Sequence, residues 1–345
     1  MQKRVCLKDI AQKVGVSTAL VSYVLNNQKV DRIRKEVAQK IKDTARELNY
    51  RTNHIAKSLK TNKTFTIGLI VADISNSFSS SLARIIEDEA EKNDYTVIFG
   101  SSDENGQKCA KLIQVFLNHQ VDGLIIAPPF DAADQLRSLQ QQNVPFVLID
   151  RFFPGLEAPF VAIDNYRAAF SAVEHLLANG YRRIGFVGFD SPLNHLQERG
   201  RGYRDALRQH GLPPEARQIK SLPLSFTHRQ VEQAIDELLA LPEPVDALLF
   251  VSNLLSTHGL KYLNTLDLSV PADLGVVSFD QSDAADLFYA PLTHIHQPLR
   301  EMGRQATQML LESLGSPKAP ARGVFMEAEL VMGKSSRRYE VGNTK

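Results

Sequence analysis

The stretch of residues 7–26 reads LKDIAQKVGVSTALVSYVLN and decides the fold of the N-terminal part of the chain. Apolar residues recur at helical spacing on both sides of a glycine-containing break, which predicts two short helices joined by a tight turn. Gly15 suits this turn because it tolerates positive φ, and Ser17 can cap the second helix through its hydroxyl. The apolar face of a third predicted helix carries Val37, Ile41, Ala45 and Leu48. This pattern is typical of a helix-turn-helix DNA-binding unit.

Charge is divided unevenly along the chain. The whole sequence has a net charge of +1, but residues 1–63 hold 15 Lys and Arg against 5 Asp and Glu, a net charge of +10. The remaining residues hold 25 against 34, a net charge of −9. A dense basic segment attracts polyanions, and the release of bound counterions makes that binding salt-dependent. The charge therefore indicates nucleic acid as the partner of the first segment, which an arbitrary helical bundle would not explain.

Composition limits the class of protein. The chain has 345 residues, of which 43% are hydrophobic, so it can form more than one core. Cys6 and Cys109 cannot build a disulfide framework, and no Cys/His spacing typical of a metal site occurs, so we expect neither a metal nor a cofactor. No apolar run approaches the ~18 residues that a membrane span needs, and MQKRVCLKDI has no apolar signal-peptide core. A cytoplasmic protein without a membrane partner is expected.

The rest of the chain alternates short apolar runs with helical stretches. TIGLIV, YTVIFG, DGLIIA and FVLID come first, followed by RIGFVG, DALLFV and GVVSF. Continuous apolar strands interleaved with amphipathic helices predict an α/β body with buried parallel sheets built from right-handed βαβ units. This pattern covers roughly 275 residues, which is more than a single lobe usually contains, so more than one lobe is expected.

Residues 7–26 resemble the N-terminal segment of the lactose/galactose repressor family. The similarity continues through LNYRTNHIAKSL at 48–59 and TIGLIVADISN at 66–76, and recurs to about residue 335. It implies a helix-turn-helix domain at 1–52, a hinge helix and linker at 53–63, and an effector-binding and dimerisation domain at 64–339. That domain would have two doubly wound lobes like those of periplasmic sugar-binding proteins. Lobe one would comprise 64–163 and 293–322, and lobe two 164–292 and 323–339, with crossings near Ile163, Leu292 and Arg322.

The resemblance also implies the DNA contacts. Base readers at the start of the second helix would be Thr18, Ala19 and Tyr23. Phosphate contacts would come from Ser17, Ser22 and Asn26, because hydroxyls and amides donate to phosphate oxygens. Tyr50 falls in the matching segment, and Asn53 opens the expected hinge helix. In that helix Leu59 would wedge into the minor groove and kink the DNA, and Ala56 would permit close approach.

Two departures from the family pattern concern the head. Many members have Arg at the position of Tyr23, so guanine readout by an arginine is not expected there. Arg34 replaces the usual capping Ser of the third helix, which weakens that cap and adds a potential phosphate contact.

For the effector, the resemblance implies six residues in a cleft beyond the carboxyl ends of the strands. They are Asp73, Phe78, Arg199, Phe226, Asn253 and Asp280. The family usually has Asp where this chain has Leu254, and Gly where it has Ser278, so the pocket is altered. A hexose, a phosphorylated sugar or a nucleobase-like ligand remain open, and the arginines favour an anionic or sugar-phosphate ligand slightly.

Two rival classes fit less well. The sequence contains no P-loop, HExxH or GxSxG motif, so no enzyme activity and no catalytic residue are predicted. A periplasmic solute-binding protein would not carry a basic head. The sequence therefore predicts a homodimeric repressor that reads a pseudopalindromic operator while a small ligand changes the angle between its lobes. Whether that ligand is an inducer or a corepressor stays open.

Overall fold

The structured chain consists of two compact units, which we call the head (Met1–Thr64) and the body (Phe65–Lys345). The computed structural model describes residues 5–26, 32–50, 63–281, 283–315 and 322–338. Within those ranges, no helix is both long and apolar enough to cross a membrane.

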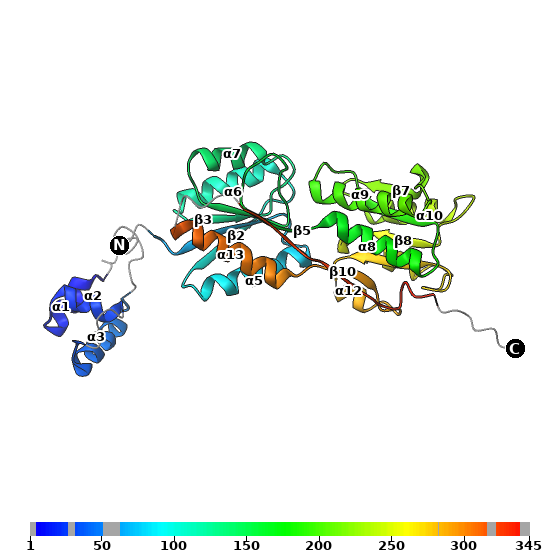
Figure 1. The fold of residues 1–345 in the computed structure, drawn as a ribbon. Coiled ribbons are helices and arrows are strands. Elements are labelled where there is room, and N and C mark those ends of the chain that lie inside the picture. The colour runs from blue at the N-terminus through cyan, green and yellow to red at the C-terminus, as the bar shows by residue number, and fades with distance from the viewer. Residues whose placement is uncertain (1–4, 27–31, 51–62, 282, 316–321, 339–345) are drawn as a thin grey trace. The chain divides into compact units, whose positions relative to one another are not determined.

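The described part of the head contains α1 (Leu7–Val14), α2 (Thr18–Leu25) and α3 (Lys35–Glu47) (Figure 1). Gly15 ends α1 with a φ of 80°, and the Ser17 hydroxyl accepts a hydrogen bond of 3.2 Å from the backbone N–H of Leu20. The turn and the cap predicted from the sequence are thus confirmed. The three helices enclose a small apolar core whose fully buried members are Ile10, Val21, Val24 and Ile41.

The body contains two sheets of six strands each (Figure 1). The first sheet, which defines lobe one, has the order β11-β5-β4-β3-β1-β2. Its strands are β1 (Thr66–Val71), β2 (Thr96–Ser101), β3 (Gly123–Ile126), β4 (Phe146–Ile149), β5 (Phe160–Ile163) and β11 (Gly323–Met326). The second sheet, which defines lobe two, has the order β12-β10-β9-β8-β6-β7. Its strands are β6 (Ile184–Phe189), β7 (Ile219–Leu222), β8 (Ala247–Phe250), β9 (Gly275–Phe279), β10 (Thr293–His296) and β12 (Glu329–Val331).

Adjacent strands pair in parallel except β10 and β12, as expected for buried βαβ units. In lobe one, successive strand residues belong to different apolar clusters: Ile125 packs with the cluster that includes Leu82 of α5, and Leu124 packs with the one that includes Phe116 of α6. Because side chains alternate across a strand, both faces of this sheet are buried. The predicted α/β class is confirmed.

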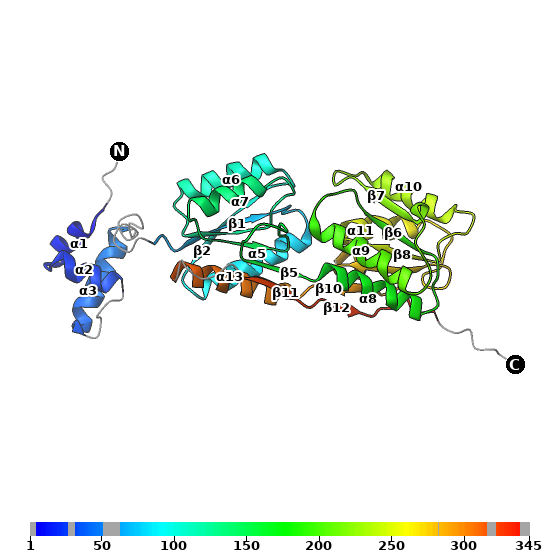
Figure 2. The ribbon, with the colours of Figure 1, turned by 45° about the horizontal axis from the view of Figure 1, so that its top comes forward.

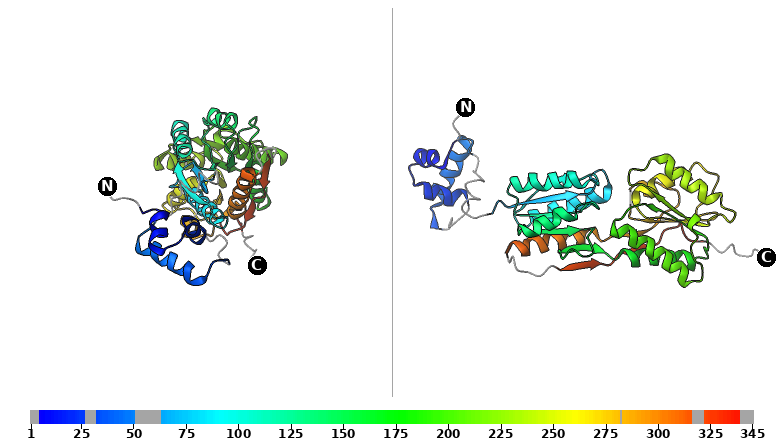
Figure 3. Two further views of the ribbon diagram at one scale, coloured as in Figure 1. Left: turned by 90° about the vertical axis from the view of Figure 1, so that its left-hand side faces the viewer. Right: turned by 90° about the horizontal axis from the view of Figure 1, so that it is seen from above.

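Helices cover both faces of each sheet (Figures 2 and 3). Lobe one carries α5 (Ser77–Glu91), α6 (Gly106–Asn118), α7 (Ala133–Gln141) and α13 (Leu299–Gly315). Lobe two carries α8 (Asn165–Ala178), α9 (Asn194–Gln209), α10 (His228–Leu239), α11 (Asn253–Leu263), the short α12 (Asp283–Asp286) and the 3-10 turn η2 (Ala216–Gln218). Close packing of α8 on α9 requires Gly202, because a Cβ there would lie 2.3 Å from the Tyr166 carbonyl oxygen.

Along the described residues of the body, the chain passes between the lobes three times. The first passage lies between β5 and α8, at the predicted position near Ile163. The other two differ from the prediction near Leu292 and Arg322, because β10 pairs with β9 in lobe two and β11 pairs with β5 in lobe one. The passages therefore follow β10 and β11 instead of preceding them. A short apolar run predicts a strand, but not which of two neighbouring sheets it joins.

Candidate DNA-binding face and ligand cleft

Helix α2 presents one polar face away from the core of the head. Val21 and Val24 are fully buried, and the positions predicted to read bases lie on the opposite side of the helix. Ser17, Thr18 and Ala19 are exposed, whereas Ser22, Tyr23 and Asn26 are partly exposed. The Asn26 amide donates to the Ser22 carbonyl oxygen at 2.8 Å, which ties these two predicted phosphate contacts together.

The remaining predicted DNA contacts do not belong to α2. Tyr50 follows α3 and packs against the core of the head, so its ring is partly buried. Arg34 precedes α3 and makes no side-chain hydrogen bond to the helix terminus, as its replacement of a capping serine implies. Asn53, Ala56 and Leu59 lie outside the described residues.

A cleft in the body collects polar side chains from the carboxyl ends of strands in both lobes. Parallel strands place their carboxyl ends at one edge of a sheet, where α/β folds bind ligands. The lining from lobe one comprises Asp73, Asn76, Phe78, Glu104, Asp150 and Arg151. The lining from lobe two comprises Phe189, His195, Leu196, Arg199, Leu224, Ser252, Asn253, Leu254, Asp280 and Gln297.

Two aspartates occupy equivalent positions in the two lobes. Asp150 directly follows β4 and Asp280 directly follows β9, and their φ angles are 67° and 66°. Aspartate adopts this left-handed conformation more readily than most other non-glycine residues. Burial raises the pKa of both carboxyl groups, against the lowering effect of neighbouring arginines.

An ion network occupies the lobe-one side of the cleft. Arg151 donates two hydrogen bonds to Glu104, at 2.6 and 2.7 Å, and its Nε lies 3.4 Å from the Asp150 carboxylate. Burial favours the neutral form of Arg151, but the hydrogen bonds and charge of Glu104 outweigh it and raise the pKa. The guanidinium of Arg151 is therefore committed to protein carboxylates.

Arg199 is held inside lobe two by three contacts. Its Nε donates to the Asn165 side-chain oxygen at 2.7 Å, Nη1 donates to the Val251 carbonyl oxygen at 2.6 Å, and the guanidinium lies 4.0 Å from the centre of the Phe279 ring. Burial lowers the pKa of Arg199, and the charges of Asp280 and Asp150 oppose that effect. These contacts fix the orientation of the side chain toward the cleft.

A pair of amides connects the two lobes across the cleft. Nδ2 of Asn253, the first residue of α11, donates to Asn76 Oδ1 at 3.0 Å and to Ser77 Oγ at 3.1 Å. Asn76 also caps α5 by accepting from the Phe78 N–H at 3.0 Å. Asn253 is thus a contact between lobes as well as a lining residue.

The cleft brings together five of the six predicted effector residues. Asp73, Phe78, Arg199, Asn253 and Asp280 line it, although the Asp73 carboxylate also accepts from the Ser75 N–H at 2.9 Å. Phe226 is not among the lining residues. It packs behind the cleft, with ring centres 5.9 Å from Phe189 and 5.6 Å from His258.

The sequence prediction missed several lining residues. Asp150 and Arg151 directly follow β4, and Gln297 directly follows β10, so the strand-end rule could have found them. His195 lies one helical turn before Arg199 on α9, and the spacing of four residues places both on one face. Glu104 gives no local signal, because its partner Arg151 is 47 residues away.

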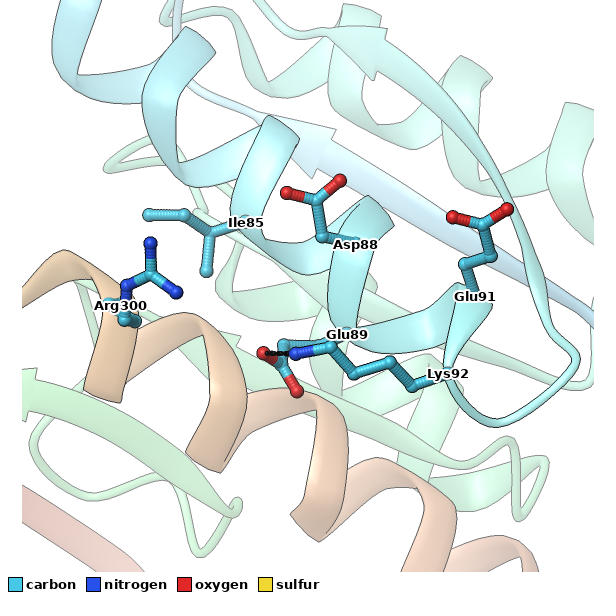
Figure 4. A pocket seen from close by; sticks show the side chains of 6 residues that line it. All are labelled: Ile85, Asp88, Glu89, Glu91, Lys92 and Arg300. Carbon is cyan, nitrogen blue, oxygen red and sulfur yellow. Dashed lines mark hydrogen bonds and ion pairs between the residues drawn. The ribbon is translucent and has the colours of Figure 1, made fainter.

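A second hollow lies between α5 and α13 on the outside of lobe one (Figure 4). Its lining consists of Ile85, Asp88, Glu89, Glu91, Lys92 and Arg300. Lys92 pairs with Glu89 at 2.5 Å (Figure 4), and the side chains of Asp88 and Glu91 are exposed. No polar side chain in this hollow is both buried and unpartnered within the described residues, so the strand-end cleft is the stronger candidate site.

Family models match both units of the chain. Residues 6–53 match bacterial regulatory proteins of the lacI family, and residues 173–336 match a periplasmic binding protein-like domain. The HTH-type transcriptional repressor CytR of Escherichia coli (strain K12) is 33% identical over 335 residues, which are 96% of each protein.

Solved structures are similar along most of the chain. The lac repressor dimer bound to operator and the anti-inducer ONPF has a TM-score of 0.86 with 22% identity, covering 97% of this chain and all of that one. A LacI family regulator from Enterococcus faecium with bound ribose has a TM-score of 0.70 with 26% identity, covering 80% of this chain and all of that one. The extended similarity to CytR, together with the head model, means that the chain belongs to the lacI family of bacterial regulatory proteins and is a DNA-binding transcription regulator.

Proposed function

We propose that this regulator is a cytoplasmic repressor that binds a pseudopalindromic operator as a homodimer and responds to a small sugar-like ligand held between its lobes. The observation that carries the proposal is the cleft, in which strand ends of both lobes converge on buried polar side chains. A ligand that contacts both lobes binds some relative orientations of the lobes better than others, and such differential binding shifts a conformational equilibrium.

The head supplies the operator contacts. Thr18, Ala19 and Tyr23 are proposed base readers, because methyl groups can meet thymine and a tyrosine can reach base edges. Ser17, Ser22 and Asn26 are proposed phosphate contacts, and the net charge of +10 on residues 1–63 supplies non-specific attraction. Asn53, Ala56 and Leu59 stay predictions for a hinge helix at the operator centre.

The homodimer is supported by an exposed apolar edge of lobe one. β2 is the last strand of its sheet, and Phe99 on this strand is 59% exposed. Exposed apolar sheet edges favour pairing with another chain. Two heads held together would read two half-sites of a pseudopalindrome.

Size and relatives support a small sugar-like ligand. The cleft has a volume of about 130 Å³, well below the range of about 300–1,000 Å³ for drug-sized pockets. The related Enterococcus faecium regulator holds ribose. Hydroxyl groups suit a lining that includes four carboxylates and three amides.

The experiment is selection from random duplex DNA by the full-length protein, with and without sugars and sugar phosphates, followed by sequencing. We expect enrichment of a pseudopalindrome whose recovery changes with one compound. Lower recovery identifies an inducer, and higher recovery identifies a corepressor. Absence of any enriched motif would contradict the operator proposal, and an enriched motif that no compound affects would contradict the ligand proposal.

A further inference from the structure

The charges in the cleft disfavour an anionic ligand. The lining contains four carboxylates, those of Asp73, Glu104, Asp150 and Asp280, against two guanidinium groups. Arg151 already makes a bidentate pair with Glu104, and Arg199 is bound to Asn165 and the Val251 carbonyl oxygen. A phosphate entering the cleft would meet more carboxyl groups than arginines, and both arginines already contact protein groups, so the presence of two arginines does not by itself favour an anionic ligand.

Gln297 presents a buried hydrogen-bond acceptor without a partner. The side chain is 3% exposed, and its Nε2 donates to Asp280 Oδ1 at 2.6 Å. The opposite orientation of the amide would place its oxygen against the Asp280 carboxylate, so the carboxylate fixes which way it points. Oε1 then has no hydrogen-bond partner within the described residues. A buried acceptor left in this state costs free energy that a ligand donor would recover.

His195 presents a second unsatisfied group in the same cleft. It is 8% exposed, and its Nδ1 is buried with no hydrogen-bond partner among the residues that the structure describes. Burial, with the charges of Arg151 and Arg199, holds the pKa of His195 well below 6.5, so the ring is uncharged near neutral pH. A neutral imidazole has one acceptor nitrogen and one N–H.

We propose that His195 is a specificity-determining residue of the cleft, where its imidazole hydrogen-bonds a hydroxyl group of an uncharged polyhydroxyl ligand. A hydroxyl can satisfy either ring nitrogen and can also donate to Gln297 Oε1, because it is both a donor and an acceptor. A phosphate group in place of that hydroxyl could accept from an N–H but could not donate to Gln297 Oε1, and it would lie among four carboxyl groups. On both grounds we expect the cleft to select a neutral sugar over its phosphate ester. This inference rests on the proposed function, since it specifies the ligand of the same cleft.

The first experiment measures the thermal shift of the full-length protein with paired probes. The probes are ribose, glucose, galactose and fructose, each beside its monophosphate ester. We expect a neutral sugar to raise Tm and to bind at least tenfold more tightly than its ester. Tighter binding of the ester overturns the inference but leaves a sugar-responsive regulator intact. Absence of binding by every probe overturns both the inference and the sugar-like ligand of the proposed function.

The second experiment uses variants of His195 with the neutral sugar that binds best. His195→Leu should weaken binding at least tenfold, whereas His195→Asn, which keeps a hydrogen-bonding group near the position of Nδ1, should stay within about threefold. The matched control is His210→Leu, because His210 closes the same helix but lies outside the cleft lining. His210→Leu should bind the sugar with the same affinity as the wild type.

A structural role for His195 predicts a different pattern. The ligand-free Tm of His195→Leu should equal or exceed that of the wild type, because the change removes an unpartnered buried nitrogen. A lower ligand-free Tm with unchanged sugar affinity would show that the ring supports the fold and would overturn the inference. The same conclusion follows if His195→Asn and His195→Leu bind the sugar equally well.

Discussion

The two sides of the cleft differ in how far their polar groups are satisfied without a ligand. On the lobe-one side, Arg151 joins Glu104 and Asp150 in an ion network, in which the buried Nε of Arg151 makes an ion pair with Asp150 but no hydrogen bond among the described residues. On the lobe-two side, Gln297 Oε1 and His195 Nδ1 are buried without partners within the described residues. Both sides end a strand in an aspartate with a left-handed backbone, so the contrast arises from the neighbours and not from the strands.

This contrast suggests different tasks for the two sides. Charges that are already paired with each other gain less from a ligand than buried groups that have no partner. Lobe two would then provide most of the ligand affinity, and lobe one would provide a rigid wall against which the cleft closes. The amide pair of Asn253 and Asn76 joins the two sides.

The largest expected effect is the loss of the lobe-one network. Arg151→Met should lower the free energy of unfolding by about 3–5 kcal/mol, because it leaves buried carboxylates unpaired. Denaturant titration of the variant and the wild type measures this difference.

A matched control for that variant is Arg137→Met. Arg137 pairs with Asp134 at 2.6 Å on α7, but both side chains are more than half exposed. Arg137→Met should lower the free energy of unfolding by less than about 1 kcal/mol. Equal losses for the two arginine variants would contradict the idea that the buried ion network of lobe one stabilises the fold.

A smaller effect is expected at the junction of the two sides. In a double-mutant cycle of Asn253→Ala and Asn76→Ala, the coupling energy should be about 1 kcal/mol, because each single change already removes the shared hydrogen bonds. The cycle separates this coupling from the capping of α5 by Asn76. Additive losses would mean that the amides do not link the lobes.

The smallest expected effect is a pH dependence on the lobe-two side. Because the folded-state pKa of His195 is depressed, the unfolded chain binds more protons below about pH 6.5, and stability falls as the pH decreases through that range. Asp150 and Asp280 have the opposite effect. Because their folded-state pKa values are raised, they make the folded protein less stable as the pH rises above 3.8.

Comparing the wild type with His195→Leu isolates the histidine, since both proteins keep the two aspartates. Between pH 7.5 and pH 5.5, Tm should fall more in the wild type than in the variant. An equal fall in Tm for the two proteins would mean that His195 can be protonated in the folded state, which would contradict the prediction.

Much of this fold follows from local sequence, and the remainder depends on contacts between distant residues. Apolar runs predicted the strands, and the glycine and serine at 15 and 17 predicted the turn and cap of the head. Family resemblance supplied Arg199 and Asp280, which line the cleft. The lobe to which β10 and β11 belong was not predictable, because pairing with a sheet is decided by tertiary register.

The candidate site was less predictable than the fold for the same reason. Phe226 lies behind Phe189 because of the path taken by the chain after β7, which no local pattern specifies. An arginine in the cleft suggests a site for an anion, but Arg151 is paired with Glu104. These residues are 47 positions apart, so the pairing can be seen only in the folded structure. His195 could have been found from its spacing to Arg199, but its lack of a hydrogen-bond partner could not.

The central claim is that a ligand in the cleft controls operator binding by the head, and Arg199→Ala tests it most directly. Operator affinity of the wild type and the variant would be titrated with and without the compound identified by selection, with circular dichroism to confirm folding. We predict equal ligand-free affinities, a change of at least tenfold on adding ligand to the wild type, and no change for the variant. A folded variant that responds like the wild type would contradict the account.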